Sequence, residues 1–450
     1  MTVVRNDHSL VARMKKFTRG ASARESMLIK FFIVLCVRSL GALSIFGLNF
    51  LVVRQLVPGE AGVFLWMYSA LMIGVQFAIM GFHDVSLKYI AQKKGVDDWA
   101  SINCISRKIL RWVFLLSGIT SLLFYGVAGP MAQWFFPGQL EAKSVFQAMS
   151  PSVLFLGLAT VLSYQLQAIH HPLKSVFVLS IGAQLFFCIL FLSMGVTSPV
   201  EAGWVYTGSC LLNLCVAVLW WFRQAPRAEY ANFESRQLWQ MAMPMWGIAI
   251  MSVTVNWGGQ FLSALWIPAD QVASYAVALR IAALINFLLI AMNFIVAPKI
   301  AQLHAKQEQV ELQHLVTQTM RTLYIMATPI VIGVVVFAGE LMSVFGSQFS
   351  SGKQILVILA LGQLINVATG PVGYLLTMTG HETAMRNMYV LSGVACISLV
   401  CVLTPLYGVV GAAWATAISM GLQNIGAALL TASKLKISVS PFGKHNANVT

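Results

Sequence analysis

Residues 273–297 read ASYAVALRIAALINFLLIAMNFIVA, and Arg280 is the one charged residue in this run. A helix of this length extends about 37 Å, which exceeds the roughly 30 Å hydrocarbon core of a bilayer. The whole chain has the same character, because 58% of its 450 residues are hydrophobic, 10% are charged and the mean hydropathy is +0.77. Soluble domains carry about 25% charged residues. The sequence therefore predicts an all-α integral membrane protein.

Apolar runs of about 20 residues predict about twelve transmembrane helices. The expected segments are 29–53, 61–83, 109–129, 148–169, 173–195, 201–222, 241–266, 273–297, 322–345, 354–378, 386–404 and 409–432. Residues 1–26 are basic and polar and lack the apolar core of a cleaved signal peptide. We therefore expect the first apolar helix to serve as the insertion signal.

Basic residues are distributed unevenly between the two sides of the predicted membrane. With the N-terminus inside, 24 Lys and Arg residues fall on the inner side, and Arg54, Lys143 and Lys353 fall on the outer side. The positive-inside rule then places both termini in the cytoplasm. The net charge of +14 follows the membrane and does not indicate a nucleic-acid partner.

Matching residues recur at a constant offset of 210 positions, which indicates a tandem repeat. The pairs include Pro58 with Pro268, Glu60 with Asp270, Ile90-Ala91-Gln92 with Ile300-Ala301-Gln302, His171 with His381, and Trp204 with Trp414. Six helices bring the chain back to its starting side, so the two repeats are parallel and enclose a central cavity between them. The expected division is a basic cytoplasmic segment 1–28, an N-lobe 29–222, a cytoplasmic linker 223–240, a C-lobe 241–432 and a cytoplasmic tail 433–450.

Polar side chains at helical spacing mark the helices that can line this cavity. Helix seven carries Ser252, Asn256, Gln260 and Ser263 along one face, helix two carries Ser69, Gln76 and His83, helix eight carries Asn286 and Asn293, and helix one carries Arg38 and Asn49. Two interpretations remain open, because polar side chains inside membranes also bind neighbouring helices together. Gly370 and Pro371 interrupt helix ten at mid-depth, as either a fixed kink or a hinge.

The charged residues inside the membrane indicate the cargo. Arg38 and Arg280 lie within apolar runs, whereas no carboxylate falls convincingly at mid-depth. An arginine at that depth is costly unless it faces a cavity, snorkels or bonds backbone carbonyls, and its planar fork matches phosphate oxygens. Asp84 and Lys88, four residues apart, are expected to form a helix ion pair. The arginines favour an anionic cargo over the cationic cargo of carboxylate-dependent antiporters.

Motifs for enzymatic chemistry do not occur in the sequence. A P-loop, a G-x-S-x-G elbow and an HExxH motif are all missing, so we expect a transporter rather than an enzyme, with no cofactor. The seven cysteines form no CxxC pair, so we expect neither a disulfide framework nor a metal site.

Three patches of the sequence carry a family resemblance. They are RQLVPGEAGVFLWMYSAL (54–71) with MGFHDVSLKYIAQ (80–92), ASYAVALRIAALI with APKIAQLHAK (273–306), and LLTMTGHETAMRN (375–387) with PLYGVVGAAWATAIS (405–419). These patches resemble the polysaccharide biosynthesis/export family of lipid-linked oligosaccharide flippases. This family belongs to the superfamily that includes multidrug exporters of the MATE type and the peptidoglycan-precursor flippase.

The resemblance implies two lobes around a central cavity in the bacterial inner membrane. It implies alternating-access transport of undecaprenyl-diphosphate-linked repeat units of O-antigen, capsule or exopolysaccharide from the inner to the outer leaflet. The membrane lipids, and a polymerase or assembly protein, are the expected partners. The expected substrate-binding residues are Arg38, Asn49, Gln76, His83, Asn256, Gln260, Arg280 and Asn286. A MATE-like, cation-coupled small-molecule exporter is the alternative function.

Overall fold

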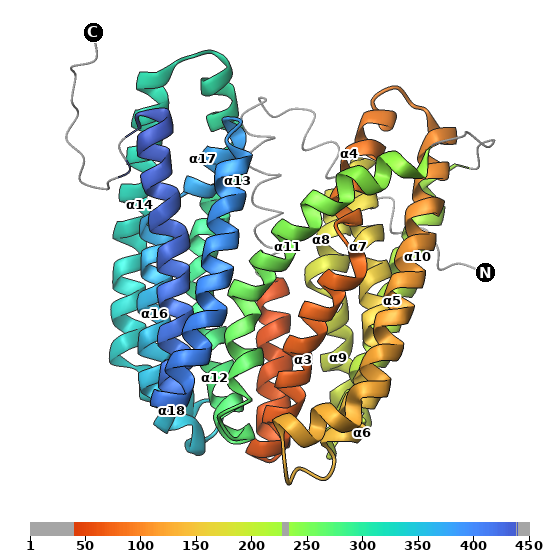
Figure 1. The fold of residues 1–450 in the computed structure, drawn as a ribbon, viewed down its shortest axis with the longest axis vertical. Coiled ribbons are helices and arrows are strands. Elements are labelled where there is room, and N and C mark those ends of the chain that lie inside the picture. Colours follow the sequence, from red (N-terminus) through yellow and green to blue (C-terminus); the bar gives the residue numbers. More distant parts are fainter. Residues whose placement is uncertain (1–39, 227–233, 438, 440–450) are drawn as a thin grey trace, which may run out of the picture.

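The computed structural model describes residues 40–226, 234–437 and 439, and every regular element in these ranges is a helix (Figure 1). The N-terminal segment, with Arg38, and residues 227–233 of the predicted linker lie outside the described residues. The helices of the N-lobe are Leu40–Gln55, α3 (Pro58–Ile79), α4 (Phe82–Lys94), α5 (Trp99–Phe135), α6 (Ala142–Met149), α7 (Ser152–Ala168), α8 (Pro172–Ser180), α9 (Gly182–Met194) and α10 (Pro199–Gln224).

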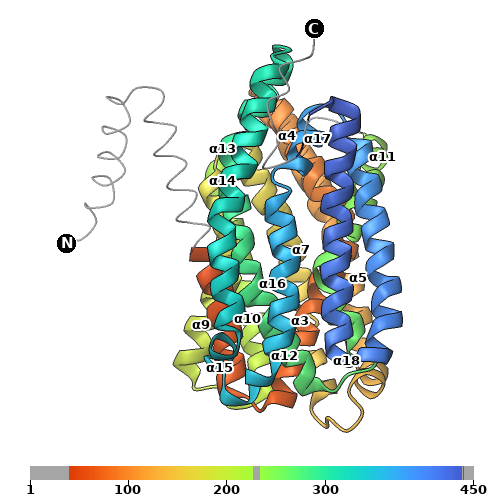
Figure 2. The same cartoon turned by 90° about the vertical axis from the view of Figure 1, so that its left-hand side faces the viewer.

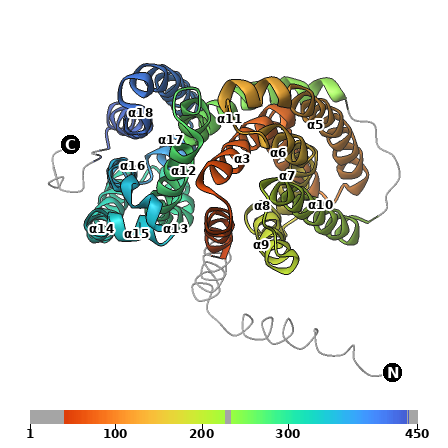
Figure 3. The ribbon, with the colours of Figure 1, turned by 90° about the horizontal axis from the view of Figure 1, so that it is seen from below.

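The C-lobe begins with α11 (Ser235–Ser263), which crosses between the lobes (Figure 1). Its other elements are α12 (Ala269–Ala283), η1 (Leu284–Asn286), α13 (Phe287–Ala305), α14 (Gln309–Val336), α15 (Ala338–Ser343), η2 (Ser347–Gly352), α16 (Lys353–Ala368), α17 (Val372–Met378) and α18 (Glu382–Leu435). The helices run nearly parallel along the long axis (Figure 2). Seen from the end, α3 of the N-lobe and α11 and α12 of the C-lobe lie where the two lobes meet (Figure 3).

The two ends of the bundle differ. We call the end that carries the α5–α6 and α11–α12 connections the closed end, because the lobes converge there (Figure 1). The opposite end carries the α10–α11 connection, and we call it the linker end.

At the linker end Asp98 caps α5 by accepting a hydrogen bond from the Ser101 N–H, at 3.0 Å. Hydrogen bonding to Ser101 lowers the pKa of the Asp98 carboxyl.

The structure confirms a multi-pass membrane protein. Nine helices of the described ranges are long and apolar enough to cross a bilayer, or ten when α8 and α9, which meet at a 49° bend, form one span. The 54-residue α18 turns at Gly408 (φ 60, ψ −143) and therefore contributes two spans. With the shorter helix Leu40–Gln55, these segments match the twelve predicted helices one for one. Large apolar side chains such as Leu122 and Phe222 are exposed on the outside, where lipid would cover them.

The prediction of one continuous helix over 61–83 was wrong. Met80 (φ 43) and Gly81 (φ 74) adopt left-handed backbone conformations that separate α3 from α4. A Cβ atom at Gly81 would lie 2.6 Å from the Ala242 carbonyl oxygen of α11. Glycine thus permits both the turn and the close approach of α11, and the turn places His83 on a different helix from Gln76.

The internal repeat is present in the structure. Equivalent boundaries of the two lobes recur at the offset of 210 residues: α5 begins at Trp99 and α14 at Gln309, α7 ends at Ala168 and α17 at Met378, and α8 begins at Pro172 and α18 at Glu382. The matched histidines His171 and His381 are both helix N-caps. The two parallel six-helix repeats expected from the sequence are therefore confirmed.

Gly370 and Pro371 separate α16 from α17, so the predicted interruption of this helix is present. Gly370 has φ +71, and a Cβ atom there would meet Met320 Cγ at 2.7 Å, whereas Gly380 has φ +79 and open space around it.

We expect Gly380→Ala to cost about 1–2 kcal/mol for the left-handed backbone alone. Gly370→Ala should cost about 1 kcal/mol more, because it also displaces Met320. Thermal unfolding of both variants in detergent measures this difference, and equal effects would contradict the contact. The role of this break as a hinge stays a prediction.

Candidate functional site between the lobes

At the closed end the two lobes are joined by direct contacts between α3 and the α11–α12 region. The Trp66 indole stacks on Phe261 with ring centroids 5.0 Å apart, and its Nε1–H donates to the Phe261 carbonyl oxygen at 2.8 Å. Gln260 Nε2 donates to the Leu65 carbonyl oxygen at 2.7 Å. We call this set of contacts the seal.

The closest approach within the seal is at Gly62. A Cβ atom on Gly62 would lie 1.7 Å from the Ala269 carbonyl oxygen at the start of α12. A side chain of any size is thus excluded at this position while the lobes are in contact. The seal closes the space between the lobes at this end.

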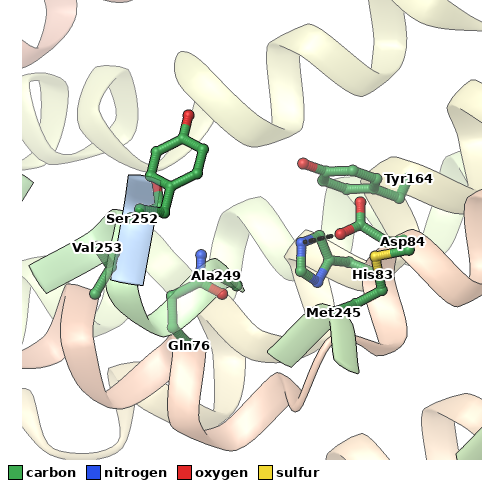
Figure 4. A pocket seen from close by; sticks show the side chains of 9 residues that line it. Gln76, His83, Asp84, Tyr164, Met245, Ala249, Ser252 and Val253 are labelled. Carbon is green, nitrogen blue, oxygen red and sulfur yellow. Dashed lines mark ion pairs between the residues drawn. The ribbon is translucent and has the colours of Figure 1, made fainter. Parts of the chain in front are cut away.

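Toward the linker end, residues of both lobes line a cavity of about 240 Å³, which we call the linker cavity (Figure 4). Its lining comes from α3, α4 and α7 of the N-lobe, from α11, and from α18. The nine lining residues are Gln76, His83, Asp84, Tyr164, Met245, Ala249, Ser252, Val253 and Tyr389. Of the eight predicted substrate-binding residues, the structure brings Gln76 and His83 together in this lining.

His83 and Asp84 form the charged corner of the linker cavity (Figure 4). His83 Nε2 lies 3.4 Å from Asp84 Oδ2, and the His83 ring meets the Tyr164 ring edge-on with centroids 4.8 Å apart. The expected ion pair between Asp84 and Lys88 is wrong, because Asp84 faces His83 and Lys88 is exposed without a carboxylate partner in the described chain. The turn at Gly81 places this corner beside the cavity.

Two residues of the linker cavity retain unused hydrogen-bonding capacity. Gln76 Oε1 and His83 Nδ1 are buried and have no hydrogen-bond partner among the described residues. A buried polar atom without a partner costs about 1–3 kcal/mol, so such atoms are commonly completed by water or a ligand.

Arg280 lies about one helical turn beyond the linker cavity, toward the closed end. Its guanidinium carbon lies 4.1 Å from the centre of the Trp257 ring and 5.9 Å from that of Tyr68, across the lobe boundary. Trp257 follows the cavity residue Val253 by four positions on α11, which is about 6 Å along the helix. Arg280, Trp257 and Tyr68 therefore form a second group, the arginine group, directly next to the cavity.

The charge of Arg280 has no counter-ion in the described chain. No Asp or Glu of residues 40–226 or 234–437 lies within ion-pair distance, and Arg280 Nε is buried without a hydrogen-bond partner. Arg280 follows the first residue of α12, Ala269, by eleven positions, or about 17 Å, which is near the middle of a bilayer core. The sequence placed this helix start at residue 273, four positions later. A cation–π contact worth up to about 2 kcal/mol compensates only part of the cost of such a charge.

The remaining predicted site residues lie elsewhere in the fold. Asn49 Nδ2 donates to the Ile45 carbonyl oxygen and Asn256 Nδ2 to the Ser252 carbonyl oxygen, each within its own helix. Gln260 belongs to the seal. Asn286 accepts a hydrogen bond from Asn366 Nδ2 at 3.2 Å inside the C-lobe. None of these lines the linker cavity, and their roles in substrate binding stay predictions.

Sequence reasoning missed the aromatic residues of both groups and the position of Asp84. The polar stripe on helix seven pointed to Asn256. The residue that contacts Arg280 is instead its neighbour Trp257, through the indole ring. Aromatic residues are common throughout membrane helices, so no periodic signal separates Trp257 or Tyr68 from ordinary packing residues.

Comparisons with known proteins support a transporter fold. No family model matches the chain. A stretch of 182 residues is 26% identical to the probable low-salt glycan biosynthesis flippase Agl15 of Haloferax volcanii, and this match covers 39% of each chain. The chain thus aligns with about two fifths of the length of this curated relative.

Solved structures match over almost the whole described chain. The lipid II flippase MurJ, in an inward closed conformation, superimposes with a TM-score of 0.71 at 14% identity, covering 90% of this chain and 87% of that chain. An inward-facing MATE family transporter of the MOP superfamily gives a TM-score of 0.70 at 13% identity, covering 88% of this chain and 94% of that chain. The chain therefore has the fold that these two solved structures share. The two-lobed helical fold that the sequence resemblance implied is confirmed, and the similar proteins are described as transporters or flippases.

Proposed function

We propose that the chain is a flippase that moves undecaprenyl-diphosphate-linked oligosaccharide repeat units from the inner to the outer leaflet of the cytoplasmic membrane. The observation that carries this proposal is Arg280, a mid-depth cation between the lobes that no described carboxylate neutralises. An anion arriving from outside the protein is the natural counter-ion of such a group. The diphosphate supplies that anion, and the arginine fork matches its oxygens.

The arrangement of the lobes supports loading from the linker end. The seal joins the lobes at the closed end, while the linker cavity lies on the other side of the arginine group. The described basic residues also concentrate at the linker end, for example on α4, near the start of α5 and at the end of α18. By the positive-inside rule this end faces the cytoplasm in our proposal. The structure then corresponds to an inward-facing state.

Each part of the cargo has a place in this proposal. The diphosphate binds Arg280, the glycan extends into the linker cavity, and the polyprenyl chain stays in the surrounding lipid. Opening of the seal and closure of the linker end would expose the same groups to the outer leaflet. The O-antigen, capsule or exopolysaccharide pathway supplies the repeat unit.

A cation-coupled small-molecule exporter is the second candidate, and Asp84 is the observation in its favour. The Asp84 side chain is 40% exposed and lines the linker cavity, where it would attract an organic cation. The uncompensated charge of Arg280 opposes this second function, because it would repel an organic cation that binds nearby.

Deletion of the chain in its host separates these two functions. We expect deletion to remove glycan from the cell surface and to cause lipid-linked repeat units to accumulate in the membrane, and the wild-type chain to restore both. The measurement is surface glycan staining together with mass spectrometry of extracted lipid-linked sugars. Intact surface glycan with a loss of resistance to cationic drugs would establish the exporter instead.

A further inference from the structure

We propose that the linker cavity is a subsite for neutral, hydroxyl-rich sugar units and that it rejects acidic sugars. This inference rests on the flippase function proposed above and adds the class of sugar that the cavity accepts. It is carried by the polar atoms of the cavity, by the difference between the two repeats and by the placement of charge.

Acceptor atoms on three residues of the cavity matter for sugar binding, alongside the amide and hydroxyl donors of Gln76, Tyr164, Ser252 and Tyr389. Asp84 offers carboxylate oxygens, which only accept when ionised, and Gln76 Oε1 has no donor. His83 Nε2 faces the Asp84 carboxylate at 3.4 Å, so the proton of the neutral ring belongs on Nε2 and leaves Nδ1 as an unpartnered acceptor. Sugar hydroxyls are the donors that complete such a set, whereas phosphate and carboxylate groups only accept.

Comparison of the two repeats shows that Gln76 is not simply a packing residue. At the offset of 210, Gln76 corresponds to Asn286 and His83 to Asn293. In the C-lobe, Asn366 donates a hydrogen bond to Asn286 Oδ1 at 3.2 Å. The N-lobe position equivalent to Asn366 is Leu156, which has no polar group. The C-lobe amide thus has its partner inside the protein, while the N-lobe amide is left for a ligand.

The non-polar part of the lining suits the other face of a sugar ring. Tyr164 and Met245 lie beside the His83–Asp84 corner, and Ala249 and Val253 of α11 extend the non-polar lining (Figure 4). Aromatic and aliphatic side chains cover the C–H face of a pyranose while polar groups hold its hydroxyls. A volume of about 240 Å³ is small for a ligand pocket, so the cavity holds a short part of a repeat unit.

The negative charge of the cavity lining discriminates against acidic sugars. None of the nine lining residues is Lys or Arg, and Asp84 places a carboxylate beside the buried His83. A carboxylate on the bound sugar would face Asp84 without a neutralising cation, and like charges at close range are strongly disfavoured. The diphosphate is drawn past this corner to Arg280, about one helical turn further along α11.

Three probes test the inference on the purified full-length protein in lipid nanodiscs. They are a short polyprenyl diphosphate without sugar, the same lipid with one neutral hexose, and the same lipid with one hexuronic acid. We expect the hexose probe to bind about tenfold more tightly than the hexuronate probe. Asp84→Asn should bring the two within about twofold and leave the sugar-free probe unchanged. Asp270→Asn, which removes an equal charge at an exposed position of the closed end, is the matched control and should keep the discrimination.

The possible outcomes separate this inference from the proposed function. Equal binding of the hexose and hexuronate probes, unchanged by Asp84→Asn, would overturn the subsite and leave the flippase function in place. Absence of binding even by the sugar-free diphosphate would contradict the flippase function, and the subsite with it. Loss of all binding in Asp84→Asn would show that Asp84 maintains the fold or the diphosphate site, and would also overturn the inference.

Discussion

Replacement of Arg280 by methionine is expected to abolish transport and to stabilise the empty protein. Methionine keeps most of the side-chain volume and its packing on Trp257, but it removes a mid-depth charge that has no counter-ion in the described chain. Loss of a charged contact to the diphosphate costs about 2–5 kcal/mol, so substrate affinity should fall at least about 30-fold. The melting temperature without substrate should rise, because the cost of burying the charge disappears.

Glycan display in cells and thermal unfolding of purified protein measure the two effects separately. Arg54→Met is the matched control, because Arg54 is exposed and also lies over an aromatic ring, that of Phe50 at 5.6 Å. This control should keep transport. If Arg280→Met instead lowers the melting temperature and transport together, Arg280 is a structural residue and the diphosphate site is wrong.

Gly62→Val is expected to separate the lobes at the closed end. The valine Cβ would lie 1.7 Å from the Ala269 carbonyl oxygen, and a backbone atom cannot rotate away as a side chain can. Overpacking a tight contact costs about 1–3 kcal/mol, and a clash with backbone should reach the upper part of this range. The variant should therefore favour an arrangement in which the seal is open, and transport should fall because the state with the closed seal is depleted.

Spin labels at the exposed positions Glu141 and Lys353, one on each lobe at the closed end, report this change in a cysteine-free background. We expect the label-to-label distance to increase in Gly62→Val and to stay unchanged in Gly118→Val, where no atom lies within 4 Å of the added Cβ. An unchanged distance in the folded Gly62→Val protein would show that the seal yields locally and does not hold the lobes together.

The architecture could be predicted from the sequence because its signals are local or periodic. Runs of apolar residues define twelve spans, and the offset of 210 residues defines two parallel repeats. Arg280 was identified by the contrast between its charge and its surroundings. These features need only a short window of sequence or a comparison of the chain with itself.

The closure of the bundle could not be predicted in the same way. The hydrogen bond from Gln260 to Leu65 and that from Trp66 to Phe261 each join residues 195 positions apart, and neither follows the repeat offset. Gln260 therefore looked like one member of a polar stripe, although its amide holds the lobes together. The structure shows that its partner is the Leu65 carbonyl oxygen, which the spacing of residues along one helix cannot identify.

The corner formed by His83 and Asp84 illustrates a second limit. A spacing of four residues favoured Lys88 as the partner of Asp84, because such a pair lies on one face of a continuous helix. The left-handed residues before α4 turn its first residues toward the cavity, where His83 is closer. Helical spacing gives the set of possible partners, and the local backbone decides among them.

In the flippase function proposed above, the lack of a counter-ion for Arg280 among the described residues makes both halves of the transport cycle sensitive to the membrane voltage. With the linker end in the cytoplasm, the loaded carrier combines one arginine with a diphosphate and moves outward with a net negative charge. The empty carrier returns with the arginine alone and is net positive. Each elementary charge that crosses the full potential contributes about 2.3 kcal/mol per 100 mV. An inside-negative voltage therefore favours outward movement of the cargo and inward reset of the protein, so the cycle can run in one direction without a co-transported ion.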